Sequence, residues 1–205
     1  MVKKHRKPNT VSLYIEGGGD QRTLRDELRY GFAAFFSQAG CKGKMPKIVA
    51  CGGREQAFER FQIAWTSGEQ AILLVDSEEL VNSNSAWEHF RQRKGDQHWT
   101  KPEGASDDTA HLMVCCMESW FLADREALIK YFGQGFNVNV LPHESNPIES
   151  IPKERVFDSL ERATKESQKG PYDKGNHSFK LIASIDPKKV EEASPWAGKL
   201  LDKLR

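Results

Sequence analysis

Residues 71–75, with the sequence AILLV, are the part of the chain that most restricts its fold. All of them are apolar, so a strand formed by this segment has to be covered on both faces. A strand with one face in water would instead alternate apolar and polar residues. The segment therefore predicts a central strand in a sheet with helices on both sides, the layer order of an α/β protein.

The first 132 residues alternate between short apolar segments and segments with apolar residues at helical spacing. The predicted strands are residues 11–15, 46–51, 71–75 and 112–117, and helices are expected at 20–38, from 54 onward and after 118. Asp20 is the predicted N-cap of the first helix. This alternation is typical of a mainly parallel sheet with helices on both faces. A polar excursion at 82–108, with one helix predicted near 85–93, interrupts it, and its role stays open.

Residues 133–205 lack this alternation. An irregular stretch at 133–147 precedes a predicted helix at 153–168, and a loop rich in Gly, Pro and Lys is expected at 170–177. Residues 179–185 and the amphipathic stretch 195–204 follow. We expect a C-terminal helical extension that packs on the same domain.

Charge and hydropathy exclude several classes of protein. Thirty Lys and Arg against 29 Asp and Glu give a net charge of +1, so binding to a polyanion would depend on how the charges are arranged. The mean hydropathy of −0.64 and the short apolar runs predict no membrane association. No apolar stretch follows the basic residues 1–8, which predicts a cytoplasmic protein. Four cysteines without CxxC spacing predict buried free thiols and no zinc site.

Acidic residues follow three of the predicted strands. Glu16 ends the first, Asp76 and Glu78 follow the third, and Glu118 follows the fourth, with Asp20 four residues after Glu16. The carboxyl ends of parallel strands meet at one edge of a sheet, where ligands bind. In an extended Asp76-Ser77-Glu78 segment, both carboxylates would point to the same side.

Unpaired carboxylates that cluster repel one another unless a cation neutralises them. Ligation by oxygen alone favours Mg²⁺ or Mn²⁺, and such an ion suits attack on a phosphodiester bond. Taken singly, each acid also fits a helix cap or a solvated residue. Their joint position at strand ends favours the metal site.

Two basic segments are candidates for the same edge. Gly53 and Arg54 stand where a strand ends and a helix begins, so Arg54 could contact a phosphate, the acids, or only a local ion pair. Lys174 and His177 fall in the predicted loop and could contact the scissile phosphate or protonate a leaving oxygen. The alternative for that loop is a solvated turn with Ser178 as a helix cap.

The motif Ile15-Glu16-Gly17, followed later by Asp76-Ser77-Glu78, resembles the Toprim domain of topoisomerases, primases and overcoming-lysogenization-defect nucleases, over about residues 10–132. The Toprim pattern is Asp-x-Asp, so the glutamate at position 78 is a departure. A wider pattern resembles the bacterial family called domain of unknown function 4276 over nearly the whole chain; its motifs are YIEGGGD from 14, CGGR from 51, LVDSE from 74, CMESWFLAD from 116 and KGNHSF from 174.

These resemblances imply a Mg²⁺- or Mn²⁺-dependent nuclease, an effector of anti-phage defence encoded beside an ABC-type or overcoming-lysogenization-defect-type ATPase. They imply a Toprim-like domain at 1–132 and the extension at 133–205. The implied metal ligands are Asp76 and Glu78, with Glu16 as the acid–base or metal-binding glutamate and with Asp20 and Glu118 as supporting acids that could also bind the metal. The implied substrate contacts come from Gly18, Gly53, Arg54 and Lys174, with His177 as a further catalytic residue.

Two other hypotheses compete with a nuclease that cleaves RNA, such as tRNA, or DNA. A receiver-like phosphoacceptor also has acids after its first strand and an Asp after its third, although Glu16 and Asp20 are not adjacent as receiver acids are. A non-catalytic subunit of an ATPase complex would use the acids only to fold or to bind its partner. The sequence leaves a homo-oligomer open.

Overall fold

The computed structural model describes residues 10–205, and the basic residues 1–8 on which the cytoplasmic prediction depends lie outside that range. A four-stranded sheet in the order β2-β1-β3-β4 forms the centre, and all its neighbouring strands are parallel. The strands are β1 (Ser12–Ile15), β2 (Lys47–Ala50), β3 (Ala71–Asp76) and β4 (Ala110–Met113). Every residue of β3 is buried, as its apolar sequence predicts. The predicted α/β fold is confirmed.

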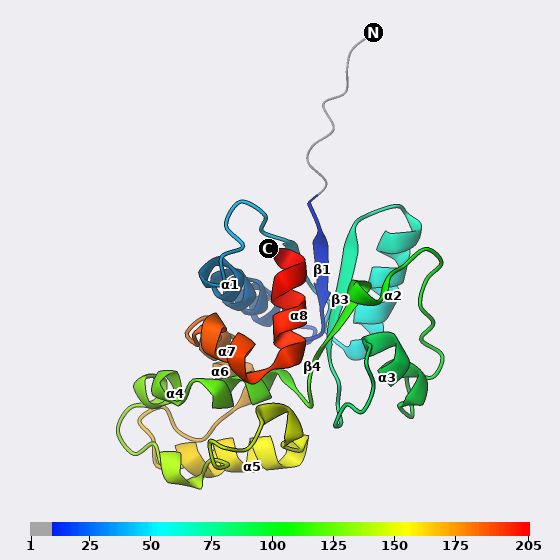
Figure 1. Cartoon of the computed structure of the whole chain (residues 1–205). Helices are drawn as coiled ribbons and strands as arrows, with labels where there is room; N and C mark the ends of the chain where they lie inside the picture. Colours follow the sequence, from blue (N-terminus) through cyan, green and yellow to red (C-terminus); the bar gives the residue numbers. More distant parts are fainter. Residues whose placement is uncertain (1–9) are drawn as a thin grey trace.

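Helices cover both faces of the sheet (Figure 1). On one face lie α1 (Arg22–Gln38), α6 (Lys174–Ile182), α7 (Pro187–Ala193) and α8 (Pro195–Leu204), and on the other α2 (Arg54–Thr66) and α3 (Ala86–Gln92). Successive residues of β3 serve the two faces in turn: Ile72 and Leu74 pack into the first core, and Leu73 and Val75 into the second.

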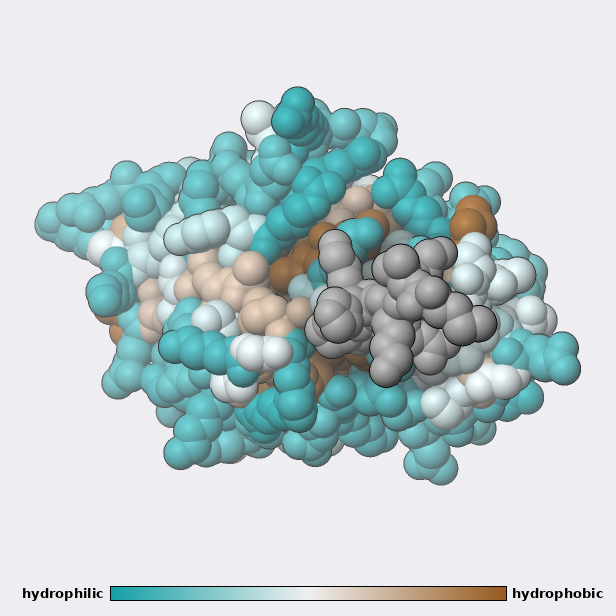
Figure 2. All heavy atoms as spheres, turned by 90° about the horizontal axis from the view of Figure 1, so that it is seen from above, coloured by the Kyte–Doolittle hydropathy of each residue, from teal (hydrophilic) through white to brown (hydrophobic). Residues whose placement is uncertain are grey.

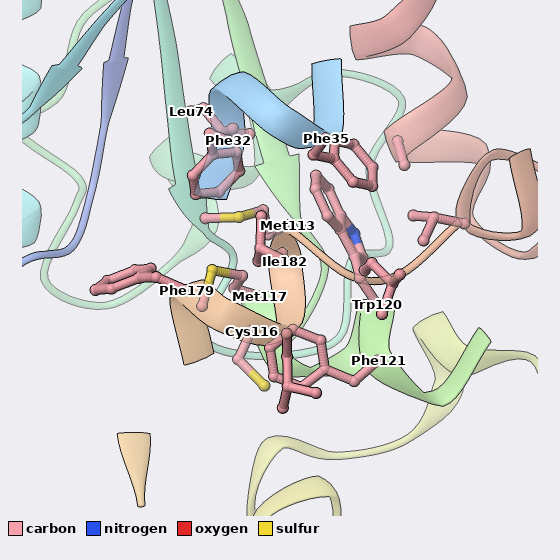
Figure 3. Packing of buried hydrophobic residues seen from close by; sticks show 14 of the residues in the cluster. Phe32, Phe35, Leu74, Met113, Cys116, Met117, Trp120, Phe121, Phe179 and Ile182 are labelled. Carbon is pink, nitrogen blue, oxygen red and sulfur yellow. The ribbon is translucent and has the colours of Figure 1, made fainter. Parts of the chain in front are cut away.

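The first core joins the sheet to the last third of the chain. Phe35 stacks on Trp120 with ring centroids 5.4 Å apart, beside Phe32 and Ile182 (Figure 3). Trp120 belongs to a 3₁₀ helix, Met117–Ala123, which leads into α4 (Arg125–Phe132), and α5 (Lys153–Thr164) buries Leu160 in the same core. The proposed extension therefore shares its hydrophobic core with the sheet.

Several predicted boundaries are wrong for local reasons. The first helix begins at Arg22 with Gln21 at its N-cap, so Asp20 does not cap it. The fourth strand ends at Met113 because Cys115 adopts a φ of 61°, which breaks the extended chain. The predicted loop at 170–177 is helical from Lys174, because the Asp173 side chain caps α6 by accepting a bond from the Asn176 N–H.

Figure 2 views the opposite, amino-terminal edge of the sheet, where most of the visible surface is hydrophilic and some hydrophobic residues show between the hydrophilic ones. All four cysteines are buried free thiols, as predicted. Among residues 10–205, the helices lack the length and apolar character needed to cross a bilayer.

Gly31 allows α6 to pack tightly against α1. A Cβ at this position would lie 2.5 Å from the carbonyl oxygen of Phe179, a backbone atom that cannot move alone. We expect Gly31→Ala to lower the free energy of unfolding by about 1–3 kcal/mol, because the helices must separate. Gly198→Ala in α8 is the control: its Cβ would have only ordinary contacts, and we expect it to stabilise by about 0.5–1 kcal/mol. Urea unfolding measures both, and equal effects would contradict the close-packing argument.

Candidate metal centre

The carboxyl edge of the sheet brings together three of the predicted acids. β1 and β3 are neighbours in register, with Ile15 opposite Leu74, so Glu16 and Asp76 leave the sheet side by side. Carboxylate oxygens of Glu16, Asp76 and Glu78 all lie within 4.8 Å of one another. Asp76 is buried, and the other two are partly exposed. Asp76 therefore lies at the inner end of the site, and Glu16 and Glu78 lie where solvent can reach them.

Glu78 reaches this cluster by a route that the sequence analysis did not foresee. Its φ of 67° shows that the segment after Asp76 is a turn, so the expected alternation of an extended chain is wrong. Bonds to the end of β4 and to the segment after it hold the turn. Ser77 N–H donates to Met113 O at 2.9 Å, and Cys115 N–H donates to Ser77 Oγ at 2.7 Å. The strained turn points both carboxylates into one site.

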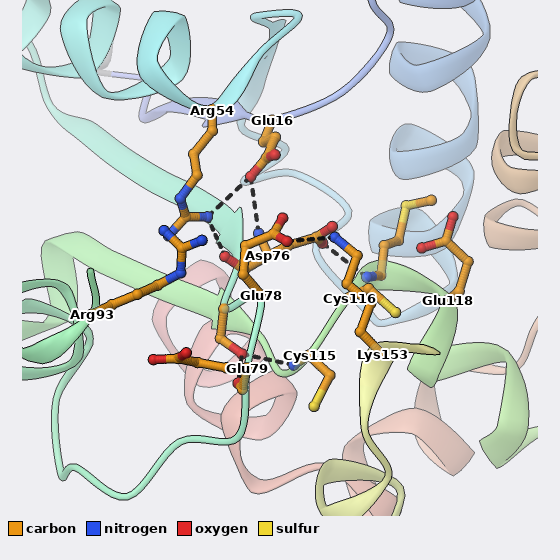
Figure 4. A network of polar contacts seen from close by, with 12 residues as sticks. Glu16, Arg54, Asp76, Glu78, Glu79, Arg93, Cys115, Cys116, Glu118 and Lys153 are labelled. Carbon is orange, nitrogen blue, oxygen red and sulfur yellow. Dashed lines mark hydrogen bonds and ion pairs between the residues drawn. The ribbon is translucent and has the colours of Figure 1, made fainter. Parts of the chain in front are cut away.

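Arg54, at the first position of α2, is the main cationic partner of Glu16. Its Nη1 donates to Glu16 Oε2 at 3.2 Å and also to the backbone carbonyl of Asp76. The backbone N–H of Asp76 donates to the same Glu16 oxygen at 3.2 Å. Figure 4 shows Arg54 and Glu16 on one side of Asp76 and Glu118 on the other. The Glu16 carboxylate is thus fixed by a side chain and by the neighbouring strand.

The excursion after β3 holds Arg54 in place. Asp96 is almost fully buried and accepts a 2.7 Å hydrogen bond from Arg54 Nη2. It also forms an ion pair with Arg93, whose Nη1 lies 3.0 Å from its other carboxylate oxygen. The Arg54 guanidinium also lies 4.9 Å from the centre of the Trp99 ring. This network gives the excursion a structural role. The sequence analysis missed Asp96 because the pair joins residues 42 positions apart.

Asp76 is the most deeply buried carboxylate of the cluster. One of its oxygens accepts a 2.8 Å bond from the Met117 N–H, and the other lies 3.9 Å from Lys174 Nζ. Burial, reinforced by the charge on Glu16, raises the pKa of Asp76 to about 8. Burial also raises the pKa of Glu16, and Arg54 only partly opposes it. In both cases the main cause is that the carboxylate is removed from water, which disfavours its charged form.

Glu78 pairs with Lys153, a residue that the sequence analysis did not select. The Lys153 ammonium, at the start of α5, lies 2.6 Å from Glu78 Oε2. Burial acts to lower the pKa of Lys153, but the bond to Glu78 and the charge on Asp76 outweigh it and raise the pKa. Nothing in the local sequence marks Lys153, because its position depends on how the C-terminal helices pack.

Glu118 is fully buried and lies outside the group of three acids. Its Oε1 accepts bonds from Tyr172 Oη at 3.0 Å and Ser178 Oγ at 3.2 Å, and it lies 3.5 Å from Lys174 Nζ. Its Oε2 has no hydrogen-bond partner among residues 10–205. Glu118 therefore serves to hold Lys174 between itself and Asp76, and Ser178 bonds to this acid instead of capping a helix.

The remaining predicted residues divide between the site and the scaffold. Gly18 lines a pocket beside the cluster, with Glu16, Asp76 and Lys174. Gly53 is the N-cap of α2 and does not line that pocket. The Asp20 side chain is fully exposed and faces Arg25.

His177 does not face the acids. Its Nδ1 accepts a 3.0 Å bond from the Asp173 N–H, and its ring packs among Tyr131, Phe132 and Tyr172. Burial lowers its pKa, which favours the neutral ring. These contacts stabilise the start of α6 and give no support to a catalytic role.

The donor set suits a hard divalent cation. The three acids offer oxygen ligands only, and Glu16 Oε1 and Glu78 Oε1 have no hydrogen bond within the described residues. Mg²⁺ in proteins typically takes one or two carboxylates together with waters and phosphate oxygens. A divalent ion at this place would also offset the repulsion between the three carboxylates.

The fold and the site define a parallel α/β protein with an acidic centre at the carboxyl edge of its sheet. The chain belongs to the family described as Domain of unknown function (DUF4276), whose model matches residues 15–205. No curated protein and no solved structure is significantly similar to it.

Proposed function

We propose that the protein is a Toprim-type nuclease that hydrolyses phosphodiester bonds with the help of Mg²⁺ or Mn²⁺. The observation that carries the proposal is the convergence of Glu16, Asp76 and Glu78 within 4.8 Å at the carboxyl edge of a parallel sheet. The resemblance to the Toprim motifs supports the same three residues as metal ligands. The nucleic acid substrate, the ATPase partner and the role in anti-phage defence are predictions from the family resemblance.

Each group of the site has a role in this proposal. Glu16, Asp76 and Glu78 hold the ion, which would activate the attacking nucleophile and stabilise the leaving oxygen. Arg54 fixes the Glu16 carboxylate, at 3.2 Å. Lys174, half exposed at the start of α6, would contact a phosphate oxygen of the substrate. Glu118 holds Lys174 close to the ion until substrate enters.

The test is a metal titration combined with a cleavage assay on the wild-type chain. Calorimetry with Mn²⁺ should show one saturable site that EDTA removes. Total RNA and plasmid DNA, incubated with Mg²⁺ or Mn²⁺ and with the partner ATPase present or absent, should show metal-dependent cleavage of one of them. Absence of Mn²⁺ binding in the folded protein would refute the proposal.

Lys174→Met should separate substrate binding from metal binding. We expect cleavage to fall by about two orders of magnitude, because the cation that contacts the transferred phosphate is lost. Mn²⁺ affinity should be kept or increased, because the ammonium that lies 3.9 Å from Asp76 no longer repels the ion. Lys180→Met on the same helix is the control, since Lys180 is exposed and bonds only to the Asn176 carbonyl. A parallel loss of Mn²⁺ binding in Lys174→Met would contradict this division of roles.

A non-catalytic subunit is the second candidate, and one observation favours it. Each acid already has a basic neighbour: Arg54 for Glu16, Lys153 for Glu78 and Lys174 for Asp76. Such a network can stabilise a fold without any ion. In that case neither Mn²⁺ binding nor cleavage would be seen, and Lys174→Met would weaken only folding or partner binding.

A further inference from the structure

A pocket of about 250 Å³ opens beside the acidic cluster, between the turn after β1 and the start of α6. Part of its lining is apolar and consists of Met113, Met117 and Phe179, which lie near one another in Figure 3; we call these three residues the apolar floor. Leu24 of α1 also contributes to the lining. The pocket therefore combines an apolar surface with the charged groups of the proposed catalytic site.

Another part of the lining has no side chains. Gly17, Gly18, Gly19 and Gly52 all line the pocket and all have positive φ values, from 48° to 128°. Gly17 and Gly52 exchange backbone hydrogen bonds of 2.7 and 2.9 Å, and Arg25 Nε donates to Gly19 O at 2.9 Å. The turn is thus held in place by its own bonds. A Cβ at Gly19 would meet no protein atom within 4 Å, so glycine leaves the backbone open to a flat ligand at this position. At Gly17 and Gly18 a Cβ would instead meet Leu28 and Arg25, so these glycines allow the turn to pack closely.

We infer that this pocket binds one unpaired nucleobase of the substrate, next to the phosphate that is cleaved. This inference rests on the proposed nuclease function. Thioethers and aromatic rings are favourable partners for the face of a base. A base on the apolar floor would place its own phosphate toward Lys174 and Asp76, which line the same pocket.

The inference selects a class of substrate. A base inside a duplex is paired and stacked, so it can enter a pocket only after it has been flipped out, which costs free energy. A base in a single strand, a loop or a bulge is already available. The protein should therefore act on single-stranded or looped nucleic acid in preference to a perfect duplex.

The experiment compares four forms of one labelled oligonucleotide with the wild-type chain. They are the single strand, the perfect duplex, the duplex with one bulged nucleotide, and the single strand with one base removed next to the cleaved bond. Cleavage is followed with Mn²⁺, and binding is followed by fluorescence anisotropy with Ca²⁺ in its place. We expect the single strand and the bulge to be bound and cleaved at least about tenfold better than the duplex, and the abasic strand to lose about tenfold.

A pair of variants assigns the effect to the pocket. Phe179→Leu keeps an apolar side chain but removes the ring, and it should reduce the difference between intact and abasic strands. Tyr30→Leu removes an exposed ring on α1 and should leave that difference unchanged. If Phe179→Leu does not fold, the comparison of intact and abasic strands on the wild-type protein still decides the question.

The outcomes separate this inference from the proposed function. Equal binding and cleavage of intact and abasic strands, or of single strand and duplex, would overturn the base pocket while leaving the nuclease in place. Base-dependent binding of the single strand without any cleavage, with the partner ATPase present or absent, would support the pocket and refute the nuclease. A free nucleoside monophosphate that binds as tightly as the strand would overturn the polymeric substrate class.

Discussion

Asp76→Asn should weaken metal binding and strongly reduce cleavage while making the metal-free protein more stable. Removal of a charged group that stabilises the transition state typically costs two or more orders of magnitude in rate, so we expect at least about a hundredfold loss of cleavage. Mn²⁺ affinity should fall because the buried, central ligand of the cluster has lost its charge. Calorimetry and the cleavage assay measure the two effects separately.

The stability gain follows from the pKa of Asp76, which burial raises to about 8. An acid whose pKa is higher in the folded state than in the unfolded state keeps its proton in the fold while the unfolded chain releases it. Stability therefore falls as the pH rises from about 4 to about 8, and Asp76→Asn removes this loss. At pH 8 without metal, we expect the variant to be more stable on the order of a few kcal/mol. Thermal melts of both proteins from pH 5 to pH 8 in EDTA test whether the stability advantage of the variant grows as the pH rises.

Two controls accompany this prediction. Asp158→Asn replaces an exposed aspartate on α5 and should change neither stability nor cleavage by a measurable amount. In the wild-type protein, added Mn²⁺ should raise the melting temperature at pH 8, because binding to the folded state alone stabilises it. Unchanged Mn²⁺ affinity in Asp76→Asn would remove Asp76 from the ligand set.

Arg54→Met should destabilise the fold by about 3–5 kcal/mol, because it leaves buried carboxylates without their main cationic partner. Asp96 would keep only Arg93, at 3.0 Å, and Glu16 would lose the 3.2 Å bond that fixes it. Cleavage should fall as well, since Glu16 is then held only by the backbone N–H of Asp76 among the described residues. Urea unfolding and the cleavage assay measure the two losses.

A double variant separates the two partners of Arg54. Asp96→Asn added to Arg54→Met should recover part of the stability, because the uncompensated charge is removed, but it should recover no activity. Arg29→Met is the matched control: Arg29 pairs with Asp26 on the surface of α1, and its loss should cost less than about 0.5 kcal/mol. An Arg54→Met protein as stable as the wild type would show that the network around Asp96 is not important for the fold.

The sheet and the acids at its carboxyl edge could be predicted because they depend on local patterns. The apolar segment at 71–75 identified the central strand, and the position of Glu16 and Asp76 after their strands placed them together. Lys174 was selected from its motif, although it lies on a helix and not in a loop. Each of these predictions used residues that are close in the sequence or that follow from the rule for parallel strands.

The partners that neutralise the acids could not be predicted, because they come from distant segments. Asp96 lies in the excursion, and Lys153 lies at the start of α5, 75 positions after Glu78. His177 illustrates the opposite error: histidine was selected for its chemistry, yet packing places its ring among aromatic residues. The position of an acid after a strand can be read from the local sequence. The ion pair that the acid forms depends on how distant segments pack in the folded chain.

The site draws on almost the whole length of the chain, from Glu16 to Lys174. During synthesis on the ribosome, the acids therefore emerge long before the lysines of α5 and α6. A growing chain has the three carboxylates but neither the ammonium beside Glu78 nor the one beside Asp76. A message broken before the codon for Lys174 yields a chain without its proposed phosphate contact. The proposed catalytic site is therefore incomplete until Lys174 has been made and α6 has folded.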